Sequence, residues 1–301
     1  MPAITSSNVA QAIVKLVAAD ALPALQSNLV MGELVSRDFE ASVAQTGDTV
    51  NIPIPPAMTA NNNAEGGNVV TQNPNLGNAQ IVLNTHAEAT FQIPDVTKVL
   101  ATPSLLALYM QPAIIAIAEK IESDLLALAP TFTANTALGA YGTALTEATV
   151  DAAETTLFKA KVKGLKYLVC DGNAYADLRK ITRFSEFHTA GEAGVRALID
   201  GTVGRIKDFA VFRSQLVKQN GSSPVQTNNL AFSRNAMALA IRRLPKPLPG
   251  TGAVAEYAEL GGYSLRILMS YQPNTLAQQF TVDALYGCGK LRETDAVLVR
   301  S

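Results

Sequence analysis

The sequence contains no tryptophan, only two cysteines and two histidines, and fewer charged residues than most soluble proteins. Charged residues make up 16% of the 301 positions, against a usual share of about 25%. The longest apolar runs, such as 113–118, have about six residues, whereas a membrane-spanning helix needs about 20. Low charge without a membrane-spanning segment indicates that partners cover much of the surface, and none of these partners is expected to be a membrane.

Residues that commonly carry chemistry are also scarce. Cys170 and Cys288 are too far apart in sequence to form a close-spaced motif, so they fit buried apolar positions in a reducing compartment. Neither His86 nor His188 has a partner motif nearby, which favours a structural or solvent role for both. Gly287-Cys-Gly-Lys290 lacks the spacing of a phosphate-binding loop. We therefore expect no catalytic residue, no metal and no cofactor, although an α/β enzyme without a recognisable site stays open as an alternative.

The overall charge hides an uneven distribution. The net charge is −1, which gives no basic signature for tight nucleic-acid binding. Residues 38–97, however, include six acidic side chains and no lysine or arginine. This imbalance is typical of a solvated face, and it also suits a flap that lies on a basic partner surface.

The same acidic stretch predicts a long hairpin. Residues 49–56 alternate apolar side chains with polar residues or proline, and 80–93 form a second extended stretch. Between them lie asparagine, glycine and proline residues that favour turns and are too poor in apolar side chains to form a core. A two-stranded excursion of this kind is only marginally stable in water, so a neighbouring surface is expected to support it.

Residues 102–130 predict one long helix. Apolar side chains recur every three or four positions, which is the period of one helical face: they are Leu106, Met110, Ile114, Ile117, Ile121, Leu125 and Leu128. Pro112 lies inside this pattern and predicts a kink, because proline removes a backbone donor and crowds the preceding turn. Glu119 and Glu122 are expected on the outer, solvated or intersubunit face.

The remaining chain alternates helices and strands. Helices are predicted at 149–163, 174–180 and 236–244, the last capped by Asn235. Strands are predicted at 165–170, 206–214 and 230–233, and a glycine-rich loop at 181–204. Three extended segments close the chain, at 254–260, 263–271 and 280–301.

The order of these segments resembles the major capsid proteins of tailed bacteriophages, which have the Hong Kong 97 fold. The resemblance covers nearly the whole chain and rests on several stretches together: RDFE (37–40) followed by GDTVNIPIP, YMQPAIIAIAEKIESDLL (109–126), YLVCDGNAYADLRK (167–180), GTVGRIKDFAVFRS (201–214), LAFSRNAMALAIRRLP (230–245) and VDALYGCGKLRETDAVLV (282–299). Each stretch alone is weak, but their order and spacing are fairly specific.

The resemblance implies an α+β fold of the Hong Kong 97 type with five parts. An N-terminal arm (1–40) precedes an extended loop with flanking strands (41–97). A peripheral domain with the long spine helix (98–133) is followed by an axial α/β domain (134–253). The last part (254–301) is expected to return as strands of the peripheral domain.

The function implied by the resemblance is assembly rather than catalysis. Copies of the chain would form hexamers and pentamers that close an icosahedral shell around double-stranded DNA, without sequence-specific binding. The shell would be the virion capsid, assembled in the cytoplasm of the bacterial host. A scaffolding protein and a portal are the expected partners, with a decoration protein left open. An encapsulin-like compartment, which shares the fold and encloses proteins, is the alternative.

Two features of the sequence indicate which kind of capsid protein to expect. The extended loop contains no lysine, which argues against a lysine-based covalent crosslink from that loop. The arm begins at Met1, which favours a separate scaffolding protein over a cleaved N-terminal segment. Candidate intersubunit contacts are polar or acidic residues of the loop region, off-stripe residues of the long helix, and two arginines of the axial domain: Asp48, Asn62, Glu65, Asn73, Glu88, Leu105, Tyr109, Ile115, Arg179 and Arg183.

Overall fold

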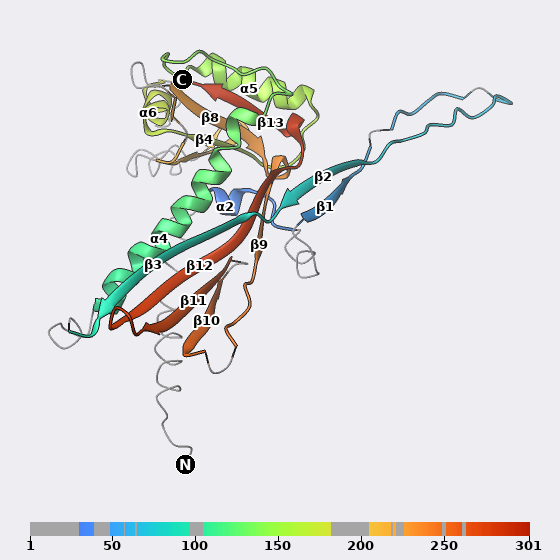
Figure 1. The fold of residues 1–301 in the computed structure, drawn as a ribbon. Helices are drawn as coiled ribbons and strands as arrows, with labels where there is room; N and C mark the ends of the chain where they lie inside the picture. The colour runs from blue at the N-terminus through green and yellow to red at the C-terminus, as the bar shows by residue number, and fades with distance from the viewer. Residues whose placement is uncertain are drawn as a thin grey trace, which may run out of the picture.

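A computed structural model describes most of the chain as two β-sheets joined by one long helix, with a hairpin that projects from the body (Figure 1). The described residues are 30–38, 49–56, 58–63, 65–96, 105–181, 205–217, 219–220, 226–248, 251–260 and 263–301. Most of the predicted arm and nearly all of the predicted glycine-rich loop therefore lie outside the described residues. Within them, no helix is long and apolar enough to cross a membrane.

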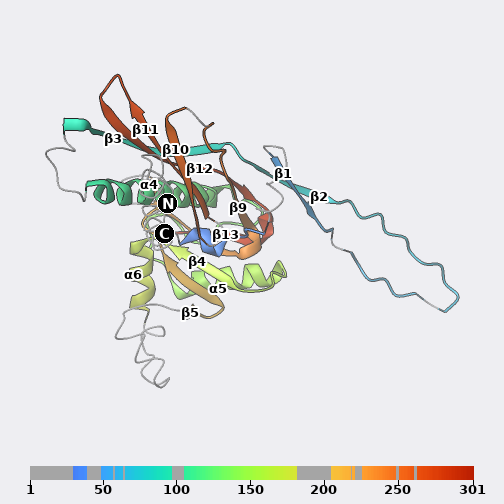
Figure 2. The same ribbon diagram turned by 90° about the horizontal axis from the view of Figure 1, so that it is seen from below.

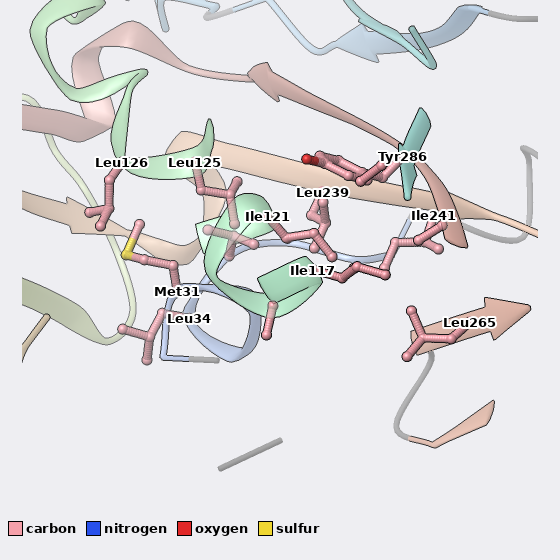
Figure 3. Packing of buried hydrophobic residues seen from close by; sticks show 14 of the residues in the cluster. Met31, Leu34, Ile117, Ile121, Leu125, Leu126, Leu239, Ile241, Leu265 and Tyr286 are labelled. Carbon is pink, nitrogen blue, oxygen red and sulfur yellow. The ribbon is translucent and has the colours of Figure 1, made fainter. Parts of the chain in front are cut away.

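The predicted long helix is confirmed as α4, Leu105–Leu126, which a short 3₁₀ helix, η2 (Ala129–Thr131), follows. Five members of its predicted apolar stripe are at most 2% exposed: Met110, Ile114, Ile117, Ile121 and Leu125. Figure 3 shows side chains of this stripe packed with Leu239, Ile241 and Tyr286. The helix thus supplies the centre of the main hydrophobic core.

The first sheet is antiparallel and lies along α4. Its strands are ordered β10 (Ala253–Leu260), β11 (Tyr263–Gln272), β12 (Ala277–Lys290) and β3 (Thr85–Pro94). Strand β9 (Met237–Arg242) pairs with the far end of β12. On β3 the residues buried toward the core alternate with exposed ones, as expected for a sheet with one covered face.

The helix predicted at 236–244 is wrong, because these residues form β9. Only a short 3₁₀ turn, η4 (Arg234–Ala236), precedes the strand. Alanine, methionine and leucine favour a helix in isolation, but here both faces of the segment are covered. Met237, Leu239 and Ile241 enter the main core, whereas Ala238 and Ala240 enter a separate cluster. Burial on both sides with period two overrides the local preference.

The second sheet is mixed and carries helices on one face. Its strands are ordered β13 (Ala296–Arg300), β8 (Gln226–Ser233), β4 (Lys166–Cys170), β6 (Phe209–Arg213) and β5 (Arg205–Ile206), and β7 (Gln219–Asn220) also pairs with β8. Strands β5 and β6 divide the single strand predicted at 206–214, because a turn at Lys207–Asp208 separates them.

Helices α5 (Glu147–Lys159) and α6 (Gly172–Lys180) contribute to the core on one face of this sheet. Each begins at a side-chain cap: Thr146 accepts a hydrogen bond from the N–H of Thr149, and Asp171 accepts one from the N–H of Asn173. Residues from the other face, such as Leu230 and Phe232, belong to the main core with α4. The long helix therefore packs between the two sheets.

Strand membership differs from the grouping expected from the sequence. Residues 254–301 were expected to act together, but β13 joins β8 in the second sheet, after the short helix η5 (Glu293–Asp295) redirects the chain. Residues 134–253 were likewise expected in one unit, but β9 pairs with β12 of the first sheet. The sequence of a hydrophobic strand does not indicate which other strand it pairs with, so these pairings between distant parts of the chain could not be predicted.

Candidate functional site

The most prominent surface feature is a hairpin that projects away from both sheets (Figures 1 and 2). Strand β1 (Thr49–Ile54) pairs in antiparallel register with β2 (Gly77–Val82), from Thr49↔Val82 to Ile54↔Gly77. This confirms the predicted two-stranded excursion. The second extended stretch is not one strand, however, because β2 ends at Val82 and β3 starts a different sheet at Thr85.

The outer part of the hairpin has a surface but no core. All described residues from Met58 to Leu76 are exposed except the half-buried Gln72. The side-chain amide of Gln72 accepts a hydrogen bond from the N–H of Thr59 at 3.1 Å, and Asn63 donates to the carbonyl of Gly67 at 3.1 Å. These bonds connect the two sides of the hairpin locally, but they bury no apolar surface.

Apolar side chains nevertheless occur on this outer part. Val69 is 84% exposed, and Met58, Val70 and Leu76 are 64–68% exposed. Exposed apolar groups on a segment without a core gain stability only when another surface covers them. The contacts predicted from the sequence in this segment are polar or acidic, and they do not include these four apolar side chains.

The base of the hairpin, by contrast, is well anchored. Val50 and Ile52 of β1 and Ala79 and Ile81 of β2 are all buried, with Leu83 just beyond. Together with Ala238 and Ala240 of β9 they form a small cluster separate from the main core. The hairpin is therefore packed against the body at its base, and its outer part extends away from the body without a core.

The predicted contact residues fall on separate surfaces rather than one site. Asn62, Glu65 and Asn73 are all exposed on the outer hairpin. Glu88 is exposed on β3, and Arg179 is exposed in the last turn of α6. Asp48 and Arg183 lie outside the described residues.

The off-stripe residues of α4 lie on its first half. Tyr109 is 48% exposed, and its ring centroid lies 5.8 Å from that of Phe91 on β3. Ile115 is half-buried. Leu105 is the first residue of the helix. Tyr109 and Ile115 thus keep apolar surface that the subunit itself does not cover.

Glu122 is buried, so the prediction that it lies on the outer face of the long helix is wrong. Its side chain is 2% exposed. One carboxylate oxygen accepts a hydrogen bond from the N–H of Val30 at 2.9 Å, and the other accepts one from the hydroxyl of Ser214. Glu122 therefore ties the helix to a segment 92 residues before it and another 92 residues after it.

A second exposed apolar group was also missed. Val96, Tyr271 and Leu276 are 71%, 47% and 64% exposed. They lie near one another at one end of the first sheet, because the N–H of Asp95 donates to the carbonyl of Leu276 and Tyr271 donates to the Asp95 carboxylate. The latter bond raises the pKa of Tyr271. This end of the sheet is a further candidate contact surface.

The described residues offer little for catalysis. No three His, Cys, Asp or Glu side chains among them converge to hold a metal ion. His86 lies 3.1 Å from the Asp283 carboxylate, which also accepts hydrogen bonds from Arg266 and so forms a structural ion cluster. Burial raises the pKa of both thiols, that of Cys288 to about 12, so neither is a thiolate at neutral pH.

No protein-family model matches the sequence, and no curated protein is similar to it. Similar solved structures do exist. A chain in the structure of Mycobacterium phage Che8 is 19% identical, with a TM-score of 0.67 over 90% of each chain. A chain in the capsid structure of cyanophage P-SCSP1u is 15% identical, with a TM-score of 0.57 over 84% of this chain and 83% of that one.

The chain has the fold of tailed-phage capsid proteins. The Hong Kong 97 fold named from the sequence is thereby confirmed. The same fold occurs in a virus-like particle from Pyrococcus furiosus, which is 11% identical with a TM-score of 0.53 over 95% of this chain and 99% of that one. Within this fold, the outer hairpin, Tyr109 and Ile115 of α4, and the sheet end at Val96, Tyr271 and Leu276 all expose apolar surface.

Proposed function

We propose that the chain is a major capsid protein whose copies form the hexamers and pentamers of an icosahedral shell around the double-stranded DNA of a tailed phage. The observation that carries this proposal is the outer hairpin, which exposes Met58, Val69, Val70 and Leu76 and contains no core of its own. A neighbouring copy is the simplest surface to cover it, and the likeness to phage capsid structures supports this choice.

The layout inferred from the sequence then assigns roles to the elements. The hairpin is the extended loop that lies on a neighbour, and α4 is the spine helix. Strands β10, β11 and β12 belong to the peripheral domain, and α5, α6, β4, β6 and β8 belong to the axial domain. The protein acts in the virion capsid, with a scaffolding protein and a portal as assembly partners. It encloses the DNA without sequence-specific binding.

An encapsulin-like compartment is the second candidate, and the likeness to the Pyrococcus particle favours keeping it. The two candidates differ in what the shell contains. Particles purified from cells that also express the neighbouring genes should hold nucleic acid if the chain is a phage capsid protein. Particles that hold only a cargo protein would favour the compartment instead.

Deletion of the outer hairpin tests the proposal directly. A variant in which a short Gly-Ser linker replaces residues 58–76 should fold with an unchanged circular dichroism spectrum, because none of the described residues in this range has a buried side chain. It should assemble poorly in sedimentation and electron microscopy, because the surface that a neighbour would cover is gone. The double variant Val69→Ser, Val70→Ser should show the same defect in milder form.

Two results would contradict this account. If the deletion variant unfolds, the hairpin belongs to the subunit core. If it assembles as well as the full chain, the hairpin carries no assembly contact, and the proposal loses the observation on which it rests.

A further inference from the structure

The hairpin base rests on a patch of unusually small residues. Strands β9 and β12 pair with Gly287 opposite Ala240 and Gly289 opposite Ala238. Ala238 and Ala240 belong to the buried cluster of the hairpin base. The residues between them, Leu239 and Cys288, belong instead to the main core. Two successive pairs on one face of this ladder therefore present only glycine and alanine to the hairpin base.

The two glycines are required by space rather than by backbone conformation. Neither has a φ in the left-handed region. A Cβ built at Gly287 would overlap the carbonyl oxygen of Val82 and lie 2.9 Å from its carbonyl carbon. A Cβ at Gly289 would lie 3.0 Å from Cγ1 of Ile81 and 3.3 Å from the carbonyl oxygen of Gln80. The backbone of β2 thus lies directly against β12.

The contact at Gly287 is the stricter one. Its obstacle is backbone, which cannot move unless β2 moves with it, whereas the nearest obstacle at Gly289 is a side-chain carbon that can shift. A methyl group at 287 would push the end of β2 away from the ladder. Because Val82 lies opposite Thr49 in the hairpin, a displacement there would tilt both strands together.

We propose that Gly287, Gly289, Ala238 and Ala240 form a seat that sets the direction in which the hairpin projects, and that this direction determines whether copies of the chain fit together. This rests on the proposed function, because it assigns the seat a part in assembly. It also gives a reason for the Gly-Cys-Gly sequence, which lacked phosphate-loop spacing and had no other explanation. The four residues act as positioning residues, because they touch the hairpin of their own subunit.

The substitution Gly287→Ala tests the seat, with Gly77→Ala as its matched control. Gly77 lies in β2 itself, and a Cβ there would meet Ile54 at 3.4 Å or more, which is an ordinary contact. In Gly287→Ala, amide hydrogen exchange should rise about tenfold or more in 49–54 and 77–82. Exchange in α4 and the second sheet should stay unchanged, and the yield of assembled particles should fall about tenfold or more. Gly77→Ala should match the wild type in both measurements.

The results that would contradict the seat differ from those that would contradict the proposed function. Unchanged exchange at 49–54 and 77–82 in Gly287→Ala would overturn the seat, and so would altered exchange with full assembly. If Gly287→Ala does not fold, the milder Gly289→Ala should show the same local exchange change to a smaller degree, and its absence would count against the seat. Failure of the wild type to assemble would contradict the proposed function, while the exchange comparison would still report on the seat's geometry.

Discussion

At the scale of single residues, buried polar groups decide how the parts of the subunit are joined. Glu122 and Asp124 lie on the same turn of α4 but face different partners. Glu122 binds Val30 and Ser214, whereas Asp124 accepts a hydrogen bond from the buried Tyr286 of β12 at 2.7 Å. Two carboxylates therefore fix the helix to the strands and segments on both sides of it.

Replacement of Glu122 by alanine should destabilise the subunit by about 2–4 kcal/mol, because it leaves two buried donors without an acceptor. Glu122→Gln should cost less, since one amide oxygen can still accept. Urea unfolding measures both. Glu119→Ala, at an exposed position of the same helix, is the control and should change stability by less than about 0.5 kcal/mol. An equal effect at 119 and 122 would contradict the burial of Glu122.

The pair between Lys166 and Asp208 gives a pH dependence. Lys166 is 5% exposed, and its hydrogen bond to Asp208 at 2.7 Å, with a smaller contribution from Arg205, lowers the pKa of that carboxyl. A lowered pKa means that the folded state binds this proton less tightly than the unfolded state. The pair's contribution is therefore complete above the ordinary aspartate pKa of about 3.9 and is lost as the pH falls below it.

Asp208→Asn should lower stability at pH 7 by about 1–2 kcal/mol, less than for a fully buried pair because Asp208 is 42% exposed. The variant should also lose less stability than the wild type between pH 5 and pH 3. Chemical unfolding across that range measures the difference. Identical pH profiles for the two proteins would show that the pair contributes nothing.

The spacing of apolar residues predicted which side chains are buried where it clearly followed a helical period. It did not predict the burial of charged residues. The α4 stripe from Met110 to Leu125 was predicted because apolar side chains recur at helical spacing. Glu122 follows a stripe residue, Ile121, by one position, so it points to a flank of that face. Only the positions of Val30 and Ser214, both far away in sequence, explain why a carboxylate is stable there.

At the scale of elements, local sequence patterns predicted the helices that correspond to α4, α5 and α6 and the extended hairpin, but not the long-range strand pairing. The capping residues Thr146 and Asp171 were not predicted, and the predicted cap Asn235 lies before a strand instead of a helix. Proline with alternating side chains predicted β1. Strand β9 was mistaken for a helix because alanine, methionine and leucine favour helices, whereas its alternate residues are buried in two different clusters. No local pattern could reveal that one of those clusters is the base of a hairpin almost 160 residues earlier in the chain.

Pro112 gives a prediction for the long helix. It lies inside α4 and is exposed, and its missing N–H leaves one helical hydrogen bond unmade. Pro112→Ala should therefore raise the free energy of unfolding by about 1–3 kcal/mol. Thermal and urea unfolding measure this, with Gln111→Ala as the neighbouring control. A destabilised Pro112→Ala protein would mean that neighbouring residues depend on a bend at this position.

The kink predicted at Pro112 also concerns assembly. As a prediction, the helix flexes at Pro112 between states of the shell, so Pro112→Ala should hold particles in one state. Comparison of the helix axis in particles before and after maturation tests this. An identical axis in both states would remove the idea.

At the scale of the whole molecule, the structure is a stable body that leaves specific surfaces uncovered. The main core, the second-sheet core and the small cluster under the hairpin account for the folded subunit. Apolar side chains of the outer hairpin, Tyr109 and Ile115 of α4, and Val96, Tyr271 and Leu276 at the sheet end lie outside these three clusters and keep exposed surface. The low share of charged residues predicted that such surfaces exist, but only the folded structure shows where they lie.

We expect these surfaces to meet between copies of the chain. Electron cryomicroscopy of the purified chain, expressed with its neighbouring genes, tests this expectation. The images should show closed particles in which rings of five and six copies repeat, with each hairpin lying on an adjacent copy. A folded protein that stays monomeric at high concentration with its scaffold present, or particles whose hairpins point freely into solvent, would contradict it.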